Sequence, residues 1–351
     1  MNYVNIIKTH YPHWGKHTAF NQIGTFLKSK DLSTRILNVP MGERWFCAPW
    51  LKKKVFRKIK SKGVAVYQLN DFVAEALTLA GVSLLKTDIV HYFDGEHTLM
   101  FLPDWIRKYK FVRSKPAIVA MFHQPPDTLG QLLNLNIVKK VDCVMVVSPT
   151  QANFFAGTLP DDRIKVVHLG VDTDHFVPNG APKRTDVFRC LSGGIWMRDY
   201  DSLLETARLL KEYSNIEFHI VSRRFDIPAD LDNIFFHENI SDAALLDLYQ
   251  TCHTLFLPFK DATANTFLME GAACGLPVIS SRLESIASYF PAGTSYLIKD
   301  NNPREFADCV LALEQNPAEL AQRSASARNR ALELSWRNIA EEYKKIYKAI
   351  V

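Results

Sequence analysis

Residues 261–279, which read DATANTFLMEGAACGLPVI, combine side chains that could bind an anion and a polyol. A helix is predicted over residues 265–274, beginning in a turn rich in Thr and Asn. The free N–H groups at its start and the helix dipole favour an anion such as a pyrophosphate, to which Asn265 and Thr266 can add hydrogen bonds. Glu270, one to two turns into the helix, could accept from the hydroxyls of a ribose. A capped helix with an exposed Glu is the commoner meaning of this pattern.

Further candidates for binding phosphate follow two predicted strands in the second half of the chain. Gly193 and Gly194 form a turn that would let the backbone come close to phosphate groups. Arg198, just beyond the turn, carries a guanidinium that can bind phosphate oxygens in a bidentate way. A surface arginine at a strand end is the alternative; it fits Arg198 equally well and Arg223 better.

In the first half of the chain, polar residues follow three predicted strands. His123 comes directly after one of them, Asp94 and Glu96 lie in the turn after another, and Gly15 and Lys16 follow the first. In parallel α/β sheets ligands bind beyond the carboxyl ends of the strands, so these residues are candidates for a binding site. Asp94, Glu96, Gly15 and Lys16 are candidate contacts for an acceptor substrate. A lone histidine in such a place more often has a structural role.

A basic stretch at residues 50–62 contains no acidic residue. Its seven cations are Lys52, Lys53, Lys54, Arg57, Lys58, Lys60 and Lys62. Leu51, Val55 and Ile59 are four apart and would share one face of a helix. This pattern is typical of a helix that lies on an anionic membrane, where each cation near the surface contributes about 1 kcal/mol of binding free energy. It is equally typical of a basic helix face exposed to solvent. Because no nucleic-acid-binding module is recognisable, we do not expect nucleic acid as a partner.

The elements that must position these residues alternate between short apolar runs and amphipathic stretches. Strands are predicted over residues 3–7, 35–39, 64–68, 89–92, 117–122, 143–147 and 164–167, and then over 188–192, 217–221, 234–237, 254–258, 277–280 and 296–298. Such alternation indicates parallel sheets with helices on both faces. A Pro- and Gly-containing linker is predicted over residues 174–186. We therefore expect two Rossmann-like, doubly wound domains that face a cleft, followed by a final helix.

Composition places the chain among globular proteins with no predicted membrane span. It has 351 residues, 47% apolar and 23% charged, and no run of about 20 apolar residues. Six widely spaced cysteines and the lack of a signal-peptide pattern favour the cytoplasm. Residues 1–175 hold 23 Lys and Arg against 14 Asp and Glu, whereas the remainder holds 19 against 23. The basic half would favour an acidic surface or an anionic acceptor.

Three segments of the sequence resemble family 4 (group 1) glycosyltransferases, which have the GT-B fold. Residues 270–278, EGAACGLPV, resemble their donor-site signature, and residues 166–176, VVHLGVDTDHF, resemble the segment that closes their first domain. Residues 335–347 are similar to their last helix, which crosses back to the first domain. The resemblance implies an acceptor-binding domain at residues 1–175, a nucleotide-sugar-binding domain at 176–334 and a crossing helix at 335–351.

The same resemblance implies the reaction. We expect a retaining glycosyl transfer, without metal or other cofactor, from a nucleotide diphosphate sugar to a glycan, a lipid-linked saccharide or another hydroxyl acceptor. Many relatives act on lipid-linked acceptors, which suggests a role in polysaccharide biosynthesis and a peripheral location at the inner membrane face.

The resemblance also assigns roles to individual residues. Glu270 matches the residue that binds the donor ribose, and Arg198 would neutralise the leaving diphosphate. His123 matches a histidine near the transferred sugar, where it would hydrogen-bond the sugar and shield the developing oxocarbenium charge. The stretch from His237 to Ile240 would border the base of the nucleotide. Gly15 and Lys16 match a glycine loop near the reaction centre.

Three positions depart from the family pattern. The family has two Glu eight positions apart, and the first falls on Ala262, for which the neighbouring Asp261 could substitute. Gly194 stands where the family has an Arg, and Asp199 where it has a Lys, which leaves Arg198 as the nearest cation. These departures keep open the alternative of a non-catalytic nucleotide-sugar-binding protein. A second alternative, a sugar-nucleotide epimerase or phosphorylase, has the same fold.

Overall fold

The computed structural model describes the chain except residues 1, 13–14, 47, 65, 110–114 and 181–182. It divides into two compact units, which are described separately. Unit 1 comprises Met1–Trp14, Asn21–His168 and Ile339–Val351, and unit 2 comprises Gly15–Phe20 and Leu169–Asn338. None of the helices in the described part of the chain is long and apolar enough to cross a membrane.

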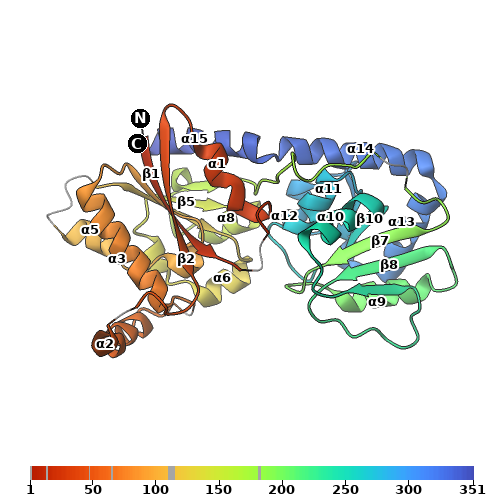
Figure 1. Ribbon diagram of the computed structural model, residues 1–351, viewed down its shortest axis with the longest axis horizontal. Coiled ribbons are helices and arrows are strands. Elements are labelled where there is room, and N and C mark those ends of the chain that lie inside the picture. The colour runs from red at the N-terminus through yellow and green to blue at the C-terminus, as the bar shows by residue number, and fades with distance from the viewer. Residues whose placement is uncertain (1, 13–14, 47, 65, 110–114, 181–182) are drawn as a thin grey trace. The chain divides into compact units, whose positions relative to one another are not determined.

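Unit 1 is built on a six-stranded parallel sheet with the order β2-β1-β3-β4-β5-β6 (Figure 1). Its strands are β1 (Asn2–His10), β2 (Leu32–Pro40), β3 (Ile89–Tyr92), β4 (Ala117–Phe122), β5 (Cys143–Val146) and β6 (Ile164–Val166). Strands β3 and β5 are buried at every position, as expected for a parallel sheet covered on both faces.

Short helices connect these strands and flank the sheet. They are α1 (Ile23–Leu27), α2 (Pro49–Lys60), α3 (Leu69–Leu84), α4 (Gly95–Thr98), α5 (Leu102–Lys108), α6 (Pro126–Leu132), α7 (Leu135–Val138) and α8 (Pro149–Phe155), with 3-10 turns η1 (Ala19–Gln22) and η2 (Asp161–Arg163). The last helix, α15 (Trp336–Ile350), contributes its residues from Ile339 onward to unit 1. There Tyr347 hydrogen-bonds His91 of β3 through its hydroxyl, 2.6 Å from Nδ1.

The strand predicted over residues 64–68 is wrong, because the described residues of that range, 64 and 66–68, form no strand. Gln68 caps the start of α3, and its backbone N–H donates to Asp71 at 2.7 Å. The Tyr67 hydroxyl donates to the buried carboxylate of Glu75 in α3 at 2.7 Å. The apolar character of this range therefore reflects side chains buried next to α3 rather than a pleated strand.

Unit 2 is built on a second six-stranded parallel sheet, with the order β12-β11-β10-β7-β8-β9. Its strands are β7 (Phe188–Gly193), β8 (Ile216–Val221), β9 (Ile234–His237), β10 (Thr254–Leu257), β11 (Val278–Ser281) and β12 (Ser295–Ile298). The helices are α9 (Tyr200–Leu209), α10 (Asp242–Thr251), α11 (Thr266–Ala273), α12 (Glu284–Tyr289), α13 (Pro303–Gln315) and α14 (Pro317–Glu333), with the 3-10 turn η3 (Lys299–Asn301). The prediction of two Rossmann-like domains is confirmed, since each unit is a parallel sheet with flanking helices.

Candidate active site

Each sheet reverses its strand order at one point, and such switch points are where open α/β sheets bind ligands. In unit 2 the reversal lies between β7 and β10, so the loops that follow these strands flank the crevice. In unit 1 it lies between β1 and β3. The sequence-predicted residues follow these strands or their neighbours, and the two groups are described in turn.

Glu270 of α11 is buried, with 4% of its surface exposed. Its Oε2 accepts a hydrogen bond from the hydroxyl of Tyr249 in α10 at 3.0 Å. Its Oε1 is buried and has no hydrogen-bond partner among the described residues. Burial raises the pKa of Glu270 to about 8, although the hydroxyls of Tyr249 and Thr18 act in the opposite direction; Thr18 forms no hydrogen bond of good geometry with Oε1. An unsatisfied buried carboxyl oxygen is costly, so Oε1 is suited to a hydrogen bond with a bound ligand.

The loop from β10 into α11 contains three further candidates. Asn265 caps α11, because its side-chain oxygen accepts from the Leu268 N–H at 3.1 Å, and Thr266 begins the helix. Asp261 accepts from the N–H of Ala262 at 2.7 Å. The oxygens of Asn265 and Asp261 thus hold the loop in shape, and the remaining N–H groups at the start of α11 keep their affinity for anions.

Arg198 is held against the carboxyl end of β7 by several contacts. Its Nε donates to the carbonyl of Gly193 at 2.6 Å, and its Nη1 donates to the carbonyl of Trp196 at 3.1 Å. Its guanidinium lies 4.5 Å from the ring centroid of Phe259. Burial lowers the pKa of Arg198 to about 10, so the side chain remains a cation at neutral pH.

The two glycines at the end of β7 make room for side chains. A Cβ at Gly194 would lie 2.7 Å from Nη2 of Arg198, and a Cβ at Gly193 would lie 2.2 Å from the ring of Phe267 in α11. Gly194 also has a φ of +89°, which other residues rarely adopt. The sequence suggested a close approach of phosphate at this turn; in the structure, Arg198 and Phe267 occupy the space beside it.

Asp199 has a structural role. It caps α9, with the Ser202 Oγ donating to its carboxylate at 2.8 Å, and it also accepts from the Nδ2 of Asn301 at 2.7 Å. A carboxylate therefore ties the β7–α9 loop to η3 at the position where a lysine would be expected from the family pattern.

Three predicted donor-site residues lie at or beyond the ends of β8 and β9, and β7 lies between these strands and β10. Arg223 is exposed after β8. His237 ends β9 and its Nε2 lies 2.9 Å from Nδ1 of His219, while Ile240 is half-buried beyond the same strand. These three residues therefore end or follow β8 and β9, whereas Glu270 lies on the helix that follows β10.

Unit 2 also includes the short segment Gly15–Phe20, which contains the predicted site residues Gly15 and Lys16. A Cβ at Gly15 would lie 2.4 Å from Oδ2 of Asp242, the first residue of α10. His17 Nδ1 lies 2.6 Å from Oδ2 of Asp172, and Lys16 is exposed. Neither His17 nor Tyr249 was predicted as a site residue. The only sequence signal for His17 is its proximity to Gly15, and nothing in the sequence links Tyr249 to Glu270.

In unit 1, Asp94, Glu96 and His123 lie together at the carboxyl ends of β3 and β4. The backbone N–H of His123 donates to Glu96 Oε1 at 3.1 Å, and Asp94 accepts from the backbone N–H of Thr9 at 2.9 Å. The Nε2 of His123 lies 2.6 Å from the carbonyl oxygen of Phe93. Because a carbonyl only accepts, Nε2 carries the proton and Nδ1 is an acceptor in the neutral ring.

Burial sets the protonation of these three groups. It lowers the pKa of His123 to about 4 and raises the pKa of Asp94 to about 7 and that of Glu96 to about 8. Glu96 Oε2 is buried without a hydrogen-bond partner among the described residues. Since Oε1 accepts from His123, a proton on Glu96 belongs on Oε2. In this cluster Nδ1 is thus the acceptor nitrogen of a neutral His123, and a protonated Glu96 can donate from Oε2.

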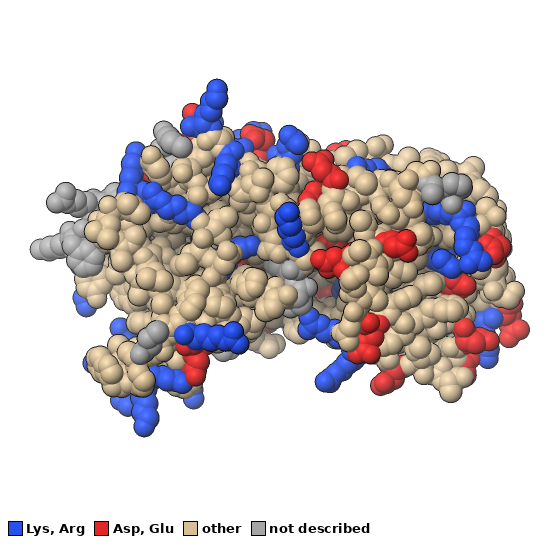
Figure 2. Space-filling model, viewed as in Figure 1, with Lys and Arg blue, Asp and Glu red and all other residues tan. Residues whose placement is uncertain are grey.

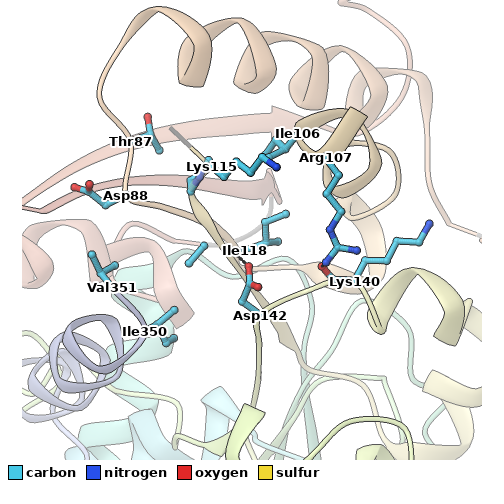
Figure 3. A pocket seen from close by; sticks show the side chains of 12 residues that line it. Thr87, Asp88, Ile106, Arg107, Lys115, Ile118, Lys140, Asp142, Ile350 and Val351 are labelled. Carbon is cyan, nitrogen blue, oxygen red and sulfur yellow. Dashed lines mark hydrogen bonds between the residues drawn. The ribbon is translucent and has the colours of Figure 1, made fainter. Parts of the chain in front are cut away.

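A pocket of about 430 Å³ lies at the opposite edge of the same sheet (Figure 3). Asp88, Lys115 and Asp142, which line it, precede β3, β4 and β5. Asp142 accepts from the backbone N–H of Ile118 and Asp88 from that of Tyr3, each at 2.7 Å. These carboxylates therefore hold the backbone, and the pocket lies at the edge of the sheet away from the candidate site.

The basic stretch forms α2, with Val55 and Ile59 buried. Trp50 and Phe56 are 82% and 48% exposed, and Lys and Arg side chains project from this part of unit 1 (Figure 2). Lys52 pairs with Glu43 at 2.6 Å. The helix thus presents both cations and aromatic rings to solvent.

Comparisons with known proteins agree with this fold. Residues 190–316, all within unit 2, match the family model described as glycosyl transferases group 1. A D-inositol 3-phosphate glycosyltransferase of Catenulispora acidiphila is 25% identical over 315 residues, covering 75% of this chain and 73% of the relative. Three other curated relatives are matched over 25% to 60% of their own length.

Solved structures resemble the whole chain. Sucrose-phosphate synthase from Thermosynechococcus elongatus has a TM-score of 0.72 at 14% identity and covers 100% of this chain and 99% of its own. The Anabaena protein HepE, in complex with UDP and glucose, has a TM-score of 0.67 at 9% identity over 99% of each chain. The GT-B fold predicted from the sequence is confirmed, and the resemblance to group 1 glycosyltransferases is supported by the family-model match over residues 190–316.

Proposed function

We propose that this protein is a retaining, metal-independent glycosyltransferase that moves a sugar from a nucleoside diphosphate sugar to a hydroxyl of a glycan or lipid-linked acceptor. The observation that carries the proposal is Glu270, whose buried Oε1 lacks a partner among the described residues. A ribose hydroxyl would supply the missing hydrogen bond. The match of residues 190–316 to the group 1 glycosyltransferase model supports the reaction class, and the bound UDP of HepE supports a nucleoside diphosphate as ligand.

In this proposal, positive charge at the β7–β10 switch point holds the diphosphate. Arg198 remains cationic, and the start of α11 adds backbone N–H groups and the helix dipole. Both would stabilise the negative charge that grows on the leaving group as the bond to the sugar breaks. A phosphate oxygen of the leaving group would then take the proton of the acceptor hydroxyl.

For unit 1 we propose contacts with sugar and acceptor. His123 is neutral at pH 7 because burial lowers its pKa to about 4. Its Nδ1 would accept from a sugar hydroxyl and would shield developing oxocarbenium charge. Asp94 and Glu96 would bind acceptor hydroxyls, with Glu96 donating from Oε2.

A non-catalytic nucleotide-sugar-binding protein is the second candidate. Asp199 favours it, because this carboxylate caps α9 at the position of an expected lysine. Ala262, which cannot accept a hydrogen bond from its side chain, points the same way. Slow hydrolysis of a nucleotide sugar in the absence of acceptor would distinguish a transferase from this binding protein.

We further propose that α2 brings the protein to anionic membrane at the inner face. Support comes from the exposed Trp50 and Phe56 beside the cations of the same helix. Attachment of this kind would suit a lipid-linked acceptor and a role in polysaccharide biosynthesis.

The reaction is tested by incubating the purified protein with UDP-, GDP- and ADP-sugars, with and without EDTA. We expect release of the diphosphate from one donor class, unchanged by EDTA, and a product that keeps the anomeric configuration by NMR. Inversion, or activity that EDTA abolishes, would contradict the mechanism. Donor binding without hydrolysis or transfer would favour the non-catalytic protein.

A further inference from the structure

A second pocket in unit 1, of about 380 Å³, lies between the end of α2 and α5. It is lined by three lysines, three aromatic residues and one acid: Lys58, Lys62, Lys108, Phe101, Trp105, Tyr109 and Asp104. It shares no residue with the cluster of Asp94, Glu96 and His123. We call it the α2–α5 pocket.

The described lining of the α2–α5 pocket carries an excess of positive charge. Its only carboxylate is that of Asp104, and two lysines share it, Lys62 Nζ at 3.6 Å and Lys140 Nζ at 2.6 Å. No described carboxylate lies within salt-bridge distance of Lys58 or Lys108. The pocket is therefore lined by three lysines and one carboxylate, that of Asp104. This carboxylate is also paired with Lys140, which does not line the pocket.

The wall of the pocket is fixed before any ligand binds. Phe101 and Trp105 stack with centroids 5.5 Å apart and an interplanar angle of 12°, and the Lys58 ammonium lies 5.3 Å from the Phe101 centroid. The buried carboxylate of Glu75 accepts from the N–H of Phe101 at 2.7 Å and from that of Leu102 at 3.1 Å, which holds the start of α5. A pre-positioned aromatic wall lowers the entropic cost of binding.

We propose that the α2–α5 pocket binds a phosphate ester. The ammonium groups of Lys58, Lys62 and Lys108 would donate to the phosphate oxygens in charge-assisted hydrogen bonds. The carbon skeleton of the ester would pack on Trp105 and Tyr109, in the way that ligand pockets combine aromatic walls with a few polar groups. The ester is either a free metabolite or the headgroup of an anionic lipid, since both present the same chemistry.

The test compares two triple variants with the same change of charge. The pocket variant replaces Lys58, Lys62 and Lys108 by Ser. The control variant replaces Lys53, Lys54 and Lys60 by Ser, which are exposed on α2 but do not line the pocket. Thermal unfolding first shows that both fold. Calorimetry with glycerol 3-phosphate, and flotation with phosphatidylcholine vesicles with and without phosphatidylglycerol, then measure binding.

A free ester predicts saturable binding of glycerol 3-phosphate to the wild type and the control variant, weakened about tenfold or more in the pocket variant. A lipid headgroup predicts no binding of the soluble probe. Vesicles with phosphatidylglycerol would then bind the pocket variant more weakly than the control variant. Equal behaviour of the two variants in both assays would overturn the proposal, because general attraction to anions depends only on the shared change in charge.

Discussion

The guanidinium of Arg198 occupies the space that the missing side chain of Gly194 leaves open: a Cβ at Gly194 would lie 2.7 Å from Nη2. The backbone at Gly194 also has a φ of +89°. Because Gly194 has no side chain, the guanidinium of Arg198 can lie against the end of β7.

Gly194→Ala is expected to displace Arg198 and to weaken binding of the donor diphosphate about tenfold or more, measured by calorimetry. The matched control is Gly293→Ala, also in unit 2, where φ is +95° and a Cβ would meet no atom within 4 Å. Both substitutions strain the backbone, but only the first moves the arginine. Equal affinities of the two variants for the diphosphate would show that Arg198 does not hold it.

Burial of Glu270 predicts a dependence of stability on pH. Its pKa rises from the ordinary 4.5 to about 8 on folding, so between these values the folded state binds more protons at this site than the unfolded state. The contribution of Glu270 to the free energy of unfolding is therefore full below pH 4.5 and is lost as the pH rises through 8. Urea unfolding across this range should show a smaller decline for Glu270→Gln than for the wild type. Parallel curves would mean that Glu270 is already ionised when folded.

His123→Ala is expected to lower kcat about 100-fold while the Kd of the nucleoside diphosphate stays unchanged. The reason is that Nδ1 is an acceptor toward the sugar, whereas the diphosphate is bound by residues of unit 2. Turnover with the cognate donor and calorimetry with the free diphosphate separate the two effects. Undiminished turnover would remove His123 from the site.

Exposed cations on α2 predict a charge-dependent affinity for membrane. Replacing Lys53 and Lys54 by Ser should weaken binding to vesicles with phosphatidylglycerol about 30-fold, at about 1 kcal/mol for each lysine. Replacing Lys345 and Lys348 on α15, also exposed, is a control with the same change in charge. Loss of vesicle binding in the control as large as that in the α2 variant would rule out a specific role for α2.

Much of the fold could be predicted because the buried strands are short apolar runs in the sequence. β10, for example, is buried at every position and reads as an uninterrupted apolar run apart from Thr254. The strand prediction for residues 64–68 is wrong because residues buried next to α3 are as apolar as the residues of a buried strand. Only tertiary contacts separate the two, such as the hydrogen bond from Tyr67 to Glu75.

Site residues could be predicted where they directly follow a strand. Their hydrogen-bond partners could not be predicted where these lie far away in the sequence. Glu270 was identified as a ligand for hydroxyls, but the sequence does not show that Tyr249, 21 positions earlier, donates to it. The position of Asp199 suggested a lost phosphate contact. Its carboxylate instead accepts from the nearby Ser202 and from Asn301 of η3, which lies 102 positions away in the chain.

The central claim is that Glu270 binds the nucleotide of the donor. It is tested most directly by calorimetric titration of the wild type and of Glu270→Ala with UDP, GDP, ADP and CMP, without metal. We predict that one diphosphate binds the wild type tightly and that Glu270→Ala loses this binding, because the substitution removes the buried oxygen Oε1 with which a ribose hydroxyl would form a hydrogen bond. Absence of binding by any of the nucleotides, or undiminished binding by the variant, would contradict the account.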